Sequence, residues 1–281
     1  QSDAARTLTS EEIDALWTIG RPAEGCERLR AALDAHPGSA DELRTQMARA
    51  LGLQGRFDEA WGELARVSEN PSVTVRIRVQ LESGRLRNSS GDREGSREYF
   101  MRALALAEEG GFDYFAVDAA HMLGIVSGGD ASIEWNRKAL DLAAHSNDER
   151  ARRWKGSLLN NLGWAWFDRG DFAQALGTFE EALRDQEATG NPVRIRVLRW
   201  SVARCLRALH RYEDALAIQS ELSQYPEEGF VSEELGELLL AMGRPEEARP
   251  YFRKAYPLLA RRLGSDSRES SRLERLKALS E

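Results

Sequence analysis

The feature that most constrains the fold of this chain is an internal repeat. A frame placed with its first position at Gly156 fits seven segments, which follow one another at spacings of 33 to 43 residues. The expected first positions are Arg6, Asp41, Ile77, Asp113, Gly156, Arg196 and Gly229. Self-similarity at this period is the mark of repeat proteins, in which each unit buries its apolar face against its neighbours. The chain is therefore predicted to be an array of stacked repeats.

Small residues recur at two positions of this frame. The eighth position is small in six of the seven segments, and the residues there are Ile13, Ala48, Gly84, Ala120, Gly163, Ala203 and Gly236. The twentieth position is small in all seven, and the residues there are Gly25, Ala60, Ser96, Ser132, Ala175, Ala215 and Ala248. Small side chains let two helices approach closely, so these positions predict helix–helix contacts. Glycine at the fifteenth position of five segments predicts where the first helix of a pair ends.

The fifth segment carries the pattern most completely. Its key residues are Leu162-Gly163, Trp166, Gly170-Asp171-Phe172, Ala175, Phe179 and Ala182-Leu183. This arrangement resembles the tetratricopeptide repeat (TPR), and the resemblance extends in frame from Arg6 to about Arg262. It implies an all-α, right-handed TPR solenoid of seven helix–turn–helix repeats, built as a single domain over residues 1–281.

Two parts of the chain depart from the repeat pattern. In the third repeat, Arg87 stands where a large apolar residue is expected, and Asn88-Ser89-Ser90-Gly91 interrupts the first helix. In the fourth repeat, Ser127-Gly128-Gly129 gives a loose turn, so irregular geometry is expected in both repeats. The last segment, about 265–281, carries Leu273, Leu276 and Leu279 among charged residues, which indicates an amphipathic helix. We expect this helix to cap the open end of the last repeat. The alternative is a helix that binds a partner.

Composition excludes several classes of function. With 42% hydrophobic and 30% charged residues over 281 positions, the chain can bury a sizeable core. Its net charge of −7 argues against a general nucleic-acid binder, which would present a basic domain. No apolar stretch approaches the roughly 18 residues that span a bilayer. No membrane association and, by default, a cytoplasmic location are therefore expected.

The sequence offers no candidate for catalysis or metal binding. The repeats leave no segment of about 100 residues for a separate catalytic domain, and no nucleotide-binding, zinc-protease or serine-hydrolase motif occurs. The four histidines, His36, His121, His145 and His210, fall in different repeats. Cys26 and Cys205 lie five repeats apart and are expected to be free packing thiols. We therefore expect no enzyme activity, no catalytic or metal-binding residues and no cofactor.

The resemblance also implies a ligand-binding surface. In TPR proteins, positions 2, 5, 9, 12 and 13 of each first helix usually line a concave groove. Applied to this chain, the rule predicts the ligand-binding residues Arg49, Arg78, Arg85, His121, Asn160, Trp164, Trp200, Arg204 and Arg207. Guanidinium groups bind carboxylates through forked hydrogen bonds, and tryptophan rings stack on peptide side chains. The predicted function is a non-enzymatic module that binds an extended, acidic peptide segment of a protein partner.

Other interpretations of the same residues stay open at this point. The arginines can equally be paired with neighbouring carboxylates on an ordinary solvated face. The clamp with which chaperone-binding TPRs hold a C-terminal carboxylate is incomplete, because Val117 and His121 precede Asn161 where the clamp requires lysine and asparagine. Alternative functions are a peptide- or ligand-sensing regulatory domain that acts through a separate effector, and a self-associating scaffold.

Overall fold

The computed structural model describes residues 6–226, 229–264, 266 and 269–281. Helices joined by short turns make up this part of the chain, and it contains no strand. None of the described helices combines the length and the apolar character needed to cross a membrane. The chain divides into two compact units, residues 1–158 and 159–281, and the division falls within helix α10 (Lys155–Arg169). The single solenoid over residues 1–281 stays a prediction.

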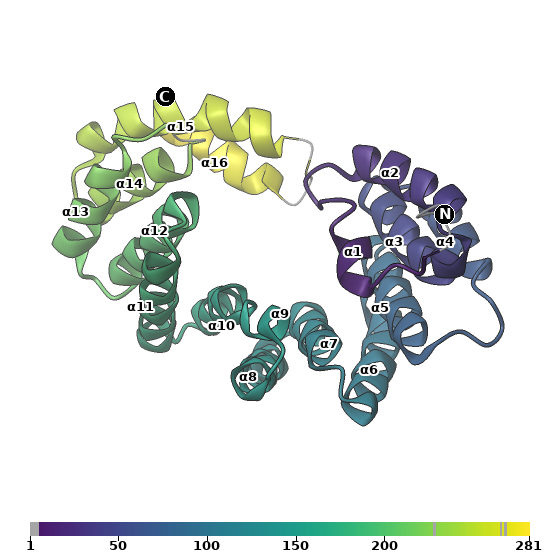
Figure 1. Ribbon diagram of the computed structural model, residues 1–281. Helices are drawn as coiled ribbons and strands as arrows, with labels where there is room; N and C mark the ends of the chain where they lie inside the picture. The colour runs from purple at the N-terminus through teal and green to yellow at the C-terminus, as the bar shows by residue number, and fades with distance from the viewer. Residues whose placement is uncertain (1–5, 227–228, 265, 267–268) are drawn as a thin grey trace. The chain divides into compact units, whose positions relative to one another are not determined.

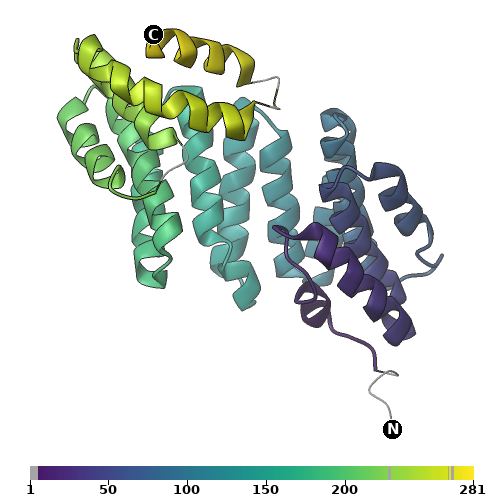
Figure 2. The same ribbon diagram turned by 90° about the horizontal axis from the view of Figure 1, so that it is seen from above.

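Unit 1 contains the first four helix pairs. They are α1 (Ser10–Asp14) with α2 (Pro22–Ala35), α3 (Ala40–Leu53) with α4 (Phe57–Ala65), α5 (Val73–Ser89) with α6 (Arg93–Gly110), and α7 (Asp113–Val126) with α8 (Gly129–His145). Helices α5 to α8 lie side by side in chain order (Figures 1 and 2), and each contacts the next. The short helix α9 (Glu149–Arg152) leads into α10. The first helix of the first repeat is only five residues long, because a capping box of Thr9 and Glu12 starts it at Ser10.

Unit 2 contains the remaining pairs and the last helix. After α10 come α11 (Phe172–Thr189), α12 (Pro192–Ala208) with α13 (Tyr212–Leu222), α14 (Phe230–Ala241) with α15 (Pro245–Leu263), and α16 (Ser270–Ser280). Leu276 of α16 is fully buried in an apolar cluster with Leu239 and Leu259 of the last repeat. This contact confirms that the amphipathic C-terminal helix covers the last repeat. Of the predicted capping segment, residues 265, 267 and 268 lie outside the described residues.

The small residues at the eighth position make the close contacts that the frame predicts. Gly84, Gly163 and Gly236 each pack against the phenylalanine that lies 16 residues further along the chain, and a Cβ atom on any of them would lie 2.6 to 2.7 Å from a ring carbon. The three phenylalanines, Phe100, Phe179 and Phe252, are fully buried. The glycine therefore makes room for the ring that fills the space between the two helices of a repeat.

The turn glycines behave as expected in four of the five repeats that carry one. Their φ angles lie between 72° and 95°, a left-handed conformation that favours glycine, and the residues are Gly55, Gly91, Gly170 and Gly243. Gly20 does not adopt it. In the sixth repeat, His210 stands at the same position with a φ of 59°. The sixth repeat thus keeps the left-handed turn without a glycine.

The expectation of irregular geometry is wrong for the third repeat. Helix α5 continues without interruption to Ser89, and the left-handed turn follows at Gly91. Arg87 is tolerated because its side chain is exposed: it pairs with Asp92 at 3.0 Å, and its guanidinium lies 5.9 Å from the centroid of the Trp61 ring. Polar residues near the end of a helix are tolerated when the turn glycine is in place. In the fourth repeat the turn does differ from the others, because Ser127 at the turn position is extended, with a φ of −89°, and the left-handed residue is Gly129.

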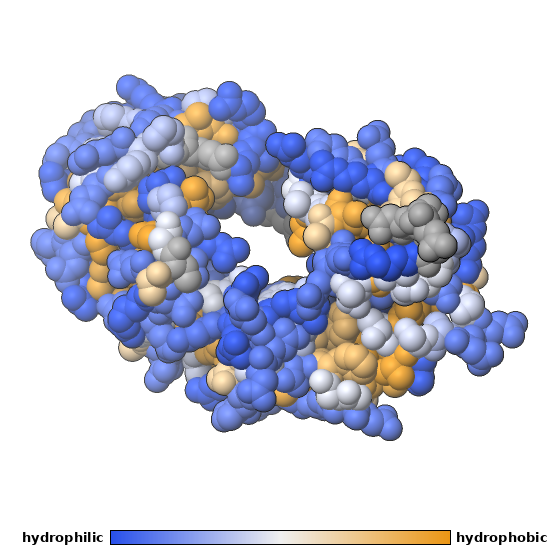
Figure 3. Space-filling view, viewed as in Figure 1, coloured by the Kyte–Doolittle hydropathy of each residue, from blue (hydrophilic) through white to orange (hydrophobic). Residues whose placement is uncertain are grey.

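Two second helices are much shorter than those in the following repeats. Helix α4 has nine residues, whereas α6 has 18, and α13 has 11, whereas α15 has 19. A short helix cannot cover the full length of its neighbours, so side chains near its end stay uncovered. Figure 3 shows apolar residues among the mostly hydrophilic surface of both units. Two of the cavities described below each lie beside one of these short helices.

Candidate functional site

The predicted groove residues of unit 1 form a network of charges on the first helices α3, α5 and α7. We call Arg49, Glu82, Arg85, Asp118 and His121 the unit 1 cluster. Arg78 lies beside it but is only 3% exposed. Its guanidinium pairs with Asp14 at 2.9 Å and with Glu42 at 2.8 Å, and lies 5.0 Å from the centroid of the Phe115 ring. Arg78 therefore cross-links three helices and is closed to a ligand.

Arg85 is the most strongly paired arginine of the unit 1 cluster. Its Nη2 donates to both carboxylate oxygens of Asp118 at 2.6 Å, and its Nη1 donates to Oε1 of Glu82 at 2.7 Å. Burial alone would raise the pKa of Asp118, but the guanidinium groups of Arg85 and Arg49 outweigh burial and hold this pKa below its ordinary value. The pKa of Arg85 is raised, because the two carboxylates outweigh its own burial.

Arg49 differs from its neighbours, because it makes no ion pair with any described residue. It lines a cavity of about 200 Å³ together with Glu82, Arg85 and Met122. Burial and the nearby charge of Arg85 lower the pKa of Arg49, and its guanidinium lies 5.9 Å from the centroid of the Trp17 ring. Oε2 of Glu82 is buried without a hydrogen-bond partner. The cavity thus offers one guanidinium that lacks a bonded carboxylate and one carboxylate oxygen that lacks a donor.

His121 lies at the edge of the unit 1 cluster, next to an aromatic ring. The centroids of its ring and the Trp154 ring are 4.9 Å apart. Burial lowers the pKa of His121, and this outweighs the opposing charge of Asp118. His121 is therefore neutral near pH 7 and contributes a polar, uncharged ring to the cluster.

The predicted groove residues of unit 2 are arranged around aromatic rings. The unit 2 cluster consists of Trp164, Phe167, Trp200, Arg204, Arg207 and Glu234. The guanidinium of Arg204 lies 5.3 Å from the centroid of the Trp164 ring, 5.2 Å from that of Phe167 and 5.0 Å from that of Trp200. These distances fall within the range of cation–π attraction. Arg204 is therefore held mainly by three ring faces.

One carboxylate serves both arginines of the unit 2 cluster. Glu234 is buried, accepts hydrogen bonds from Arg207, and lies 3.6 Å from Nε of Arg204, which is itself buried without a hydrogen bond. Burial lowers the pKa of Arg204, and Glu234 only partly offsets this. Trp200 is fixed by a hydrogen bond of 3.3 Å from its Nε1 to the carbonyl oxygen of Phe230. Asn160 lies half-buried on α10.

The sequence interpretation missed the carboxylates that hold these arginines. Glu82, Asp118 and Glu234 all stand at the sixth position of their repeats. Each follows a repeat that has arginine at its ninth position, namely Arg49, Arg85 and Arg204. The ninth position of one repeat and the sixth of the next thus face each other across two first helices. An acid at that offset is the signal that would have predicted the pairing.

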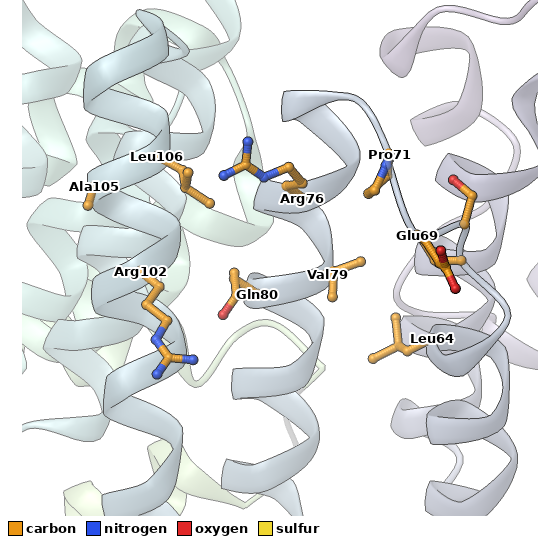
Figure 4. Close-up of a pocket in the computed structure, with 11 residues that line it drawn as sticks. Leu64, Glu69, Pro71, Arg76, Val79, Gln80, Arg102, Ala105 and Leu106 are labelled. Carbon is orange, nitrogen blue, oxygen red and sulfur yellow. The ribbon is translucent and has the colours of Figure 1, made fainter.

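Another cavity lies away from both clusters. It has a volume of about 650 Å³ and is bordered by α4, α5 and α6 of unit 1. Figure 4 shows Leu64, Val79, Gln80 and Leu106 around it. Oε1 of Gln80 is buried there without a hydrogen-bond partner. The cavity lies beside the short helix α4, which ends at Ala65 and leaves the last turns of α6 uncovered.

Comparison with known families agrees with the repeat frame. Tetratricopeptide repeat family models match residues 42–60, 156–189 and 195–261. Among proteins with curated functions, none matches the sequence significantly.

Several solved structures share the fold at low sequence identity. The apo form of RapI has a TM-score of 0.73 at 13% identity, covering 96% of this chain and 80% of RapI. A signal transduction ATPase with a TPR sensor from Pyrococcus horikoshii has a TM-score of 0.72 at 14% identity, covering 97% of this chain and 47% of that protein, so this chain spans about half its length. NprR in complex with its cognate peptide NprX has a TM-score of 0.56 at 17% identity, covering 85% of this chain and 71% of NprR.

These likenesses concern the fold. They agree with three features of the chain itself, which are the successive helix pairs, the glycine–phenylalanine contacts within repeats and the left-handed turns between helices. The chain belongs to the tetratricopeptide repeat superfamily.

Proposed function

We propose that this TPR protein is a non-enzymatic interaction module that binds an extended peptide segment of acidic character. The ligand would lie along the first helices, in the predicted concave groove. NprR, a protein of the same fold, has been solved with its cognate peptide bound, which supports a peptide as the ligand class. The acidic character rests on the arginines of this chain alone.

The observation that carries the proposal is the state of Arg49. Every other arginine of the predicted groove is already bonded to or close to a carboxylate of the chain: Arg78 to Asp14 and Glu42, Arg85 to Glu82 and Asp118, and Arg204 and Arg207 to Glu234. Arg49 is half-buried, so its guanidinium has lost part of its solvation without gaining a bonded anion. A ligand carboxylate in the adjoining cavity would supply that anion.

The remaining groove residues take different parts in this proposal. Arg78 is left out, because it is buried and fully engaged. Arg85 positions the carboxylates of Glu82 and Asp118 in unit 1. Arg207 positions the carboxylate of Glu234 in unit 2. Trp164 and Trp200 offer ring edges and faces for ligand side chains, and the amide of Asn160 can bond to the peptide backbone.

The cysteines and the histidine of the unit 1 cluster fit a binding protein better than an enzyme. Both cysteines are buried and free, and burial raises the pKa of the Cys205 thiol to about 12, so it is not a nucleophile at neutral pH. His121 is held against Trp154 and is neutral. The free thiols also support a reducing, cytoplasmic setting for the protein.

Peptide selection tests this function. A library of random peptides would be selected on the wild-type chain and on Arg49→Gln, with Arg28→Gln as the control, since Arg28 is an exposed arginine on α2 outside the cluster. We expect peptides enriched in Asp and Glu, with affinity reduced about 10-fold or more in Arg49→Gln and unchanged in Arg28→Gln. Selection without acidic enrichment, or equal affinity for all three proteins, would contradict the proposal.

The comparisons favour a second candidate function, a peptide-sensing domain that acts through a separate effector. The Pyrococcus horikoshii protein uses TPRs as its sensor, and its structure matches 97% of this chain. A sensor must change its conformational equilibrium when the ligand binds. Hydrogen exchange with and without a selected peptide would show this as altered protection in helices remote from both clusters. Changes confined to the contact residues would leave simple binding as the function.

A further inference from the structure

Unit 2 contains an apolar cavity that the repeat pattern does not predict. It has a volume of about 430 Å³ and lies where α13 ends, at Leu222. Because α13 is short, the first turns of α12 are left uncovered. Val193 and Val197 on α12 are 58% and 52% exposed, and Tyr225, just after α13, is 49% exposed. Large apolar side chains at this level of exposure, gathered around one cavity, are typical of a binding surface.

The lining of this cavity has a distinct chemistry. Eight of its ten residues are apolar or aromatic, the other two are Arg196 and Arg262, and no described lining residue is acidic. Trp200 forms one wall, and its ring is held in place by the hydrogen bond to Phe230. The same ring lies 5.0 Å from the guanidinium of Arg204, so the cavity adjoins the unit 2 cluster through Trp200.

Arg196 is the cation that this cavity offers to a ligand. Its guanidinium stacks 5.0 Å from the centroid of the Tyr225 ring and makes no ion pair with a described residue. Stacking fixes the plane of a guanidinium while leaving its N–H groups directed outward along that plane. Arg262 lies 5.8 Å from the centroid of the Phe230 ring and has further contacts of its own. The N–H groups of the Arg196 guanidinium can therefore donate to a carboxylate that lies beside an apolar group.

We infer that this cavity binds a bulky apolar side chain of a peptide and that Arg196 pairs with a carboxylate next to that side chain. The inference rests on the proposed peptide-binding function and adds a sequence preference to it: an acidic segment is recognised in unit 2 only when a large apolar residue adjoins the acid. The carboxylate can belong to the peptide C-terminus or to an Asp or Glu side chain. Both sources present the same group to Arg196.

Four short acetylated peptides separate these sources. The first ends in Ser-Gly-Phe with a free carboxylate, the second is its C-terminal amide, the third contains an internal Phe-Asp pair and ends in an amide, and the fourth ends in Ser-Gly-Ala with a free carboxylate. Binding to the full chain would be followed by NMR of the methyl groups of Val193, Val197 and Leu222. We expect the methyl signals to shift with the first or third peptide, or with both, and to stay unchanged with the second and fourth.

Two variants and one control test the part of Arg196. Arg196→Gln should lower the affinity for the first and third peptides about 10-fold or more. Val197→Glu should do the same by placing a competing carboxylate at the cavity. Val197 is 52% exposed and Arg196 is half-buried without an ion pair to a described residue, so neither change leaves a buried charge unpaired. Arg194→Gln removes an exposed charge from the same helix outside the cavity and should change nothing. Equal binding of all four peptides, no methyl shift with any of them, or equal affinity of Arg196→Gln and wild type would overturn the inference.

Failure of this inference is distinguishable from failure of the proposed function. If the peptides selected on the wild-type chain lose affinity in Arg49→Gln but not in Arg196→Gln, the chain binds acidic peptides and the cavity inference is wrong. If they lose affinity in Arg196→Gln, the inference stands, whatever the effect of Arg49→Gln.

Discussion

Arg85 in unit 1 and Arg204 in unit 2 stand at the same position of their repeats but are held in different ways. Arg85 forms a two-pronged pair with Asp118 at 2.6 Å and a second pair with Glu82. Arg204 lies 3.6 Å from the carboxylate of Glu234 and is surrounded by three aromatic rings. One repeat position therefore supports either a closed ion-pair network or a cation–π cage.

The number of carboxylates per arginine explains this difference. Arg85 has an acid at the sixth position of its own repeat, Glu82, and another at the sixth position of the next, Asp118. The sixth position in the repeat of Arg204 is Ser201, and Glu234 in the following repeat also pairs with Arg207. The rings of Trp164 and Trp200 take the place of the missing carboxylate. The same arrangement leaves Arg49 without a bonded partner, because Glu82 is bonded to Arg85.

The largest effect is expected from Arg85→Gln. This change leaves the buried carboxylates of Asp118 and Glu82 without their cation, and breaking a buried pair from one side costs about 3–5 kcal/mol. Urea denaturation followed by circular dichroism would measure the loss, and hydrogen exchange would assign it to unit 1. Arg66→Gln is the matched control, since its pair with Glu63 is exposed on the arginine side and should contribute less than about 1 kcal/mol. Equal losses of unfolding free energy in the two variants would show that the buried ion pairs of Arg85 contribute no more to stability than an exposed pair.

In unit 2, the aromatic rings should matter more than the cation. Trp164 contacts Phe167, Phe179 and Trp200 at centroid distances of 5.1 to 5.9 Å. Trp164→Ala removes these contacts and should destabilise unit 2 by about 3 kcal/mol, the lower end for a large aromatic residue, because the ring is only half-buried. Hydrogen exchange in α11 and α12 would measure this. If α11 and α12 are as well protected from exchange in Trp164→Ala as in the wild type, the aromatic rings do not stabilise unit 2 as proposed.

A smaller effect is expected from Arg204→Met. Methionine fills similar space against the rings, and Glu234 keeps its pair with Arg207. The loss is then mainly the cation–π attraction, about 1 kcal/mol. The same denaturation measurement applies, with Arg85→Gln as the comparison. If Arg204→Met costs as much as Arg85→Gln, the two clusters do not differ in the way proposed here.

The helix pairs, turns and close contacts could be predicted because they depend on residues at fixed positions. A ring at Phe179 needs a glycine at Gly163, and a tight turn at Gly170 needs a left-handed residue, so the frame alone indicates both. The frame predicted irregularity around Asn88 wrongly, because it treated each position as independent of the intact turn at Gly91.

The charge pairing and the cavities could not be predicted in the same way. Pairing of Arg85 with Asp118 depends on two repeats at once, whereas the groove rule considers one repeat at a time. The cavity beside α13 depends on where that helix ends, at Leu222, and a count of repeat positions contains no helix lengths. Arg196 was accordingly not among the expected ligand-binding residues.

The smallest expected effect is a difference between the two units in pH dependence. Burial lowers the pKa of His121 in the folded chain, where Asp118, Arg85 and Arg49 are its charged neighbours. The unfolded chain therefore binds a proton at His121 before the folded chain does. The resulting stability is fully present above the ordinary histidine pKa of about 6.5 and is lost as the pH falls below it.

Hydrogen exchange at pH 7.5 and pH 5.5, corrected for the intrinsic exchange rate, should show a loss of protection in α7 that exceeds the loss in α14. His121→Gln should abolish the difference while leaving the Arg85 network intact. If the difference persists in that variant, the pH dependence originates elsewhere in unit 1. Asp118 would not be its source, because the lowered pKa of Asp118 places its protonation in more acidic solution.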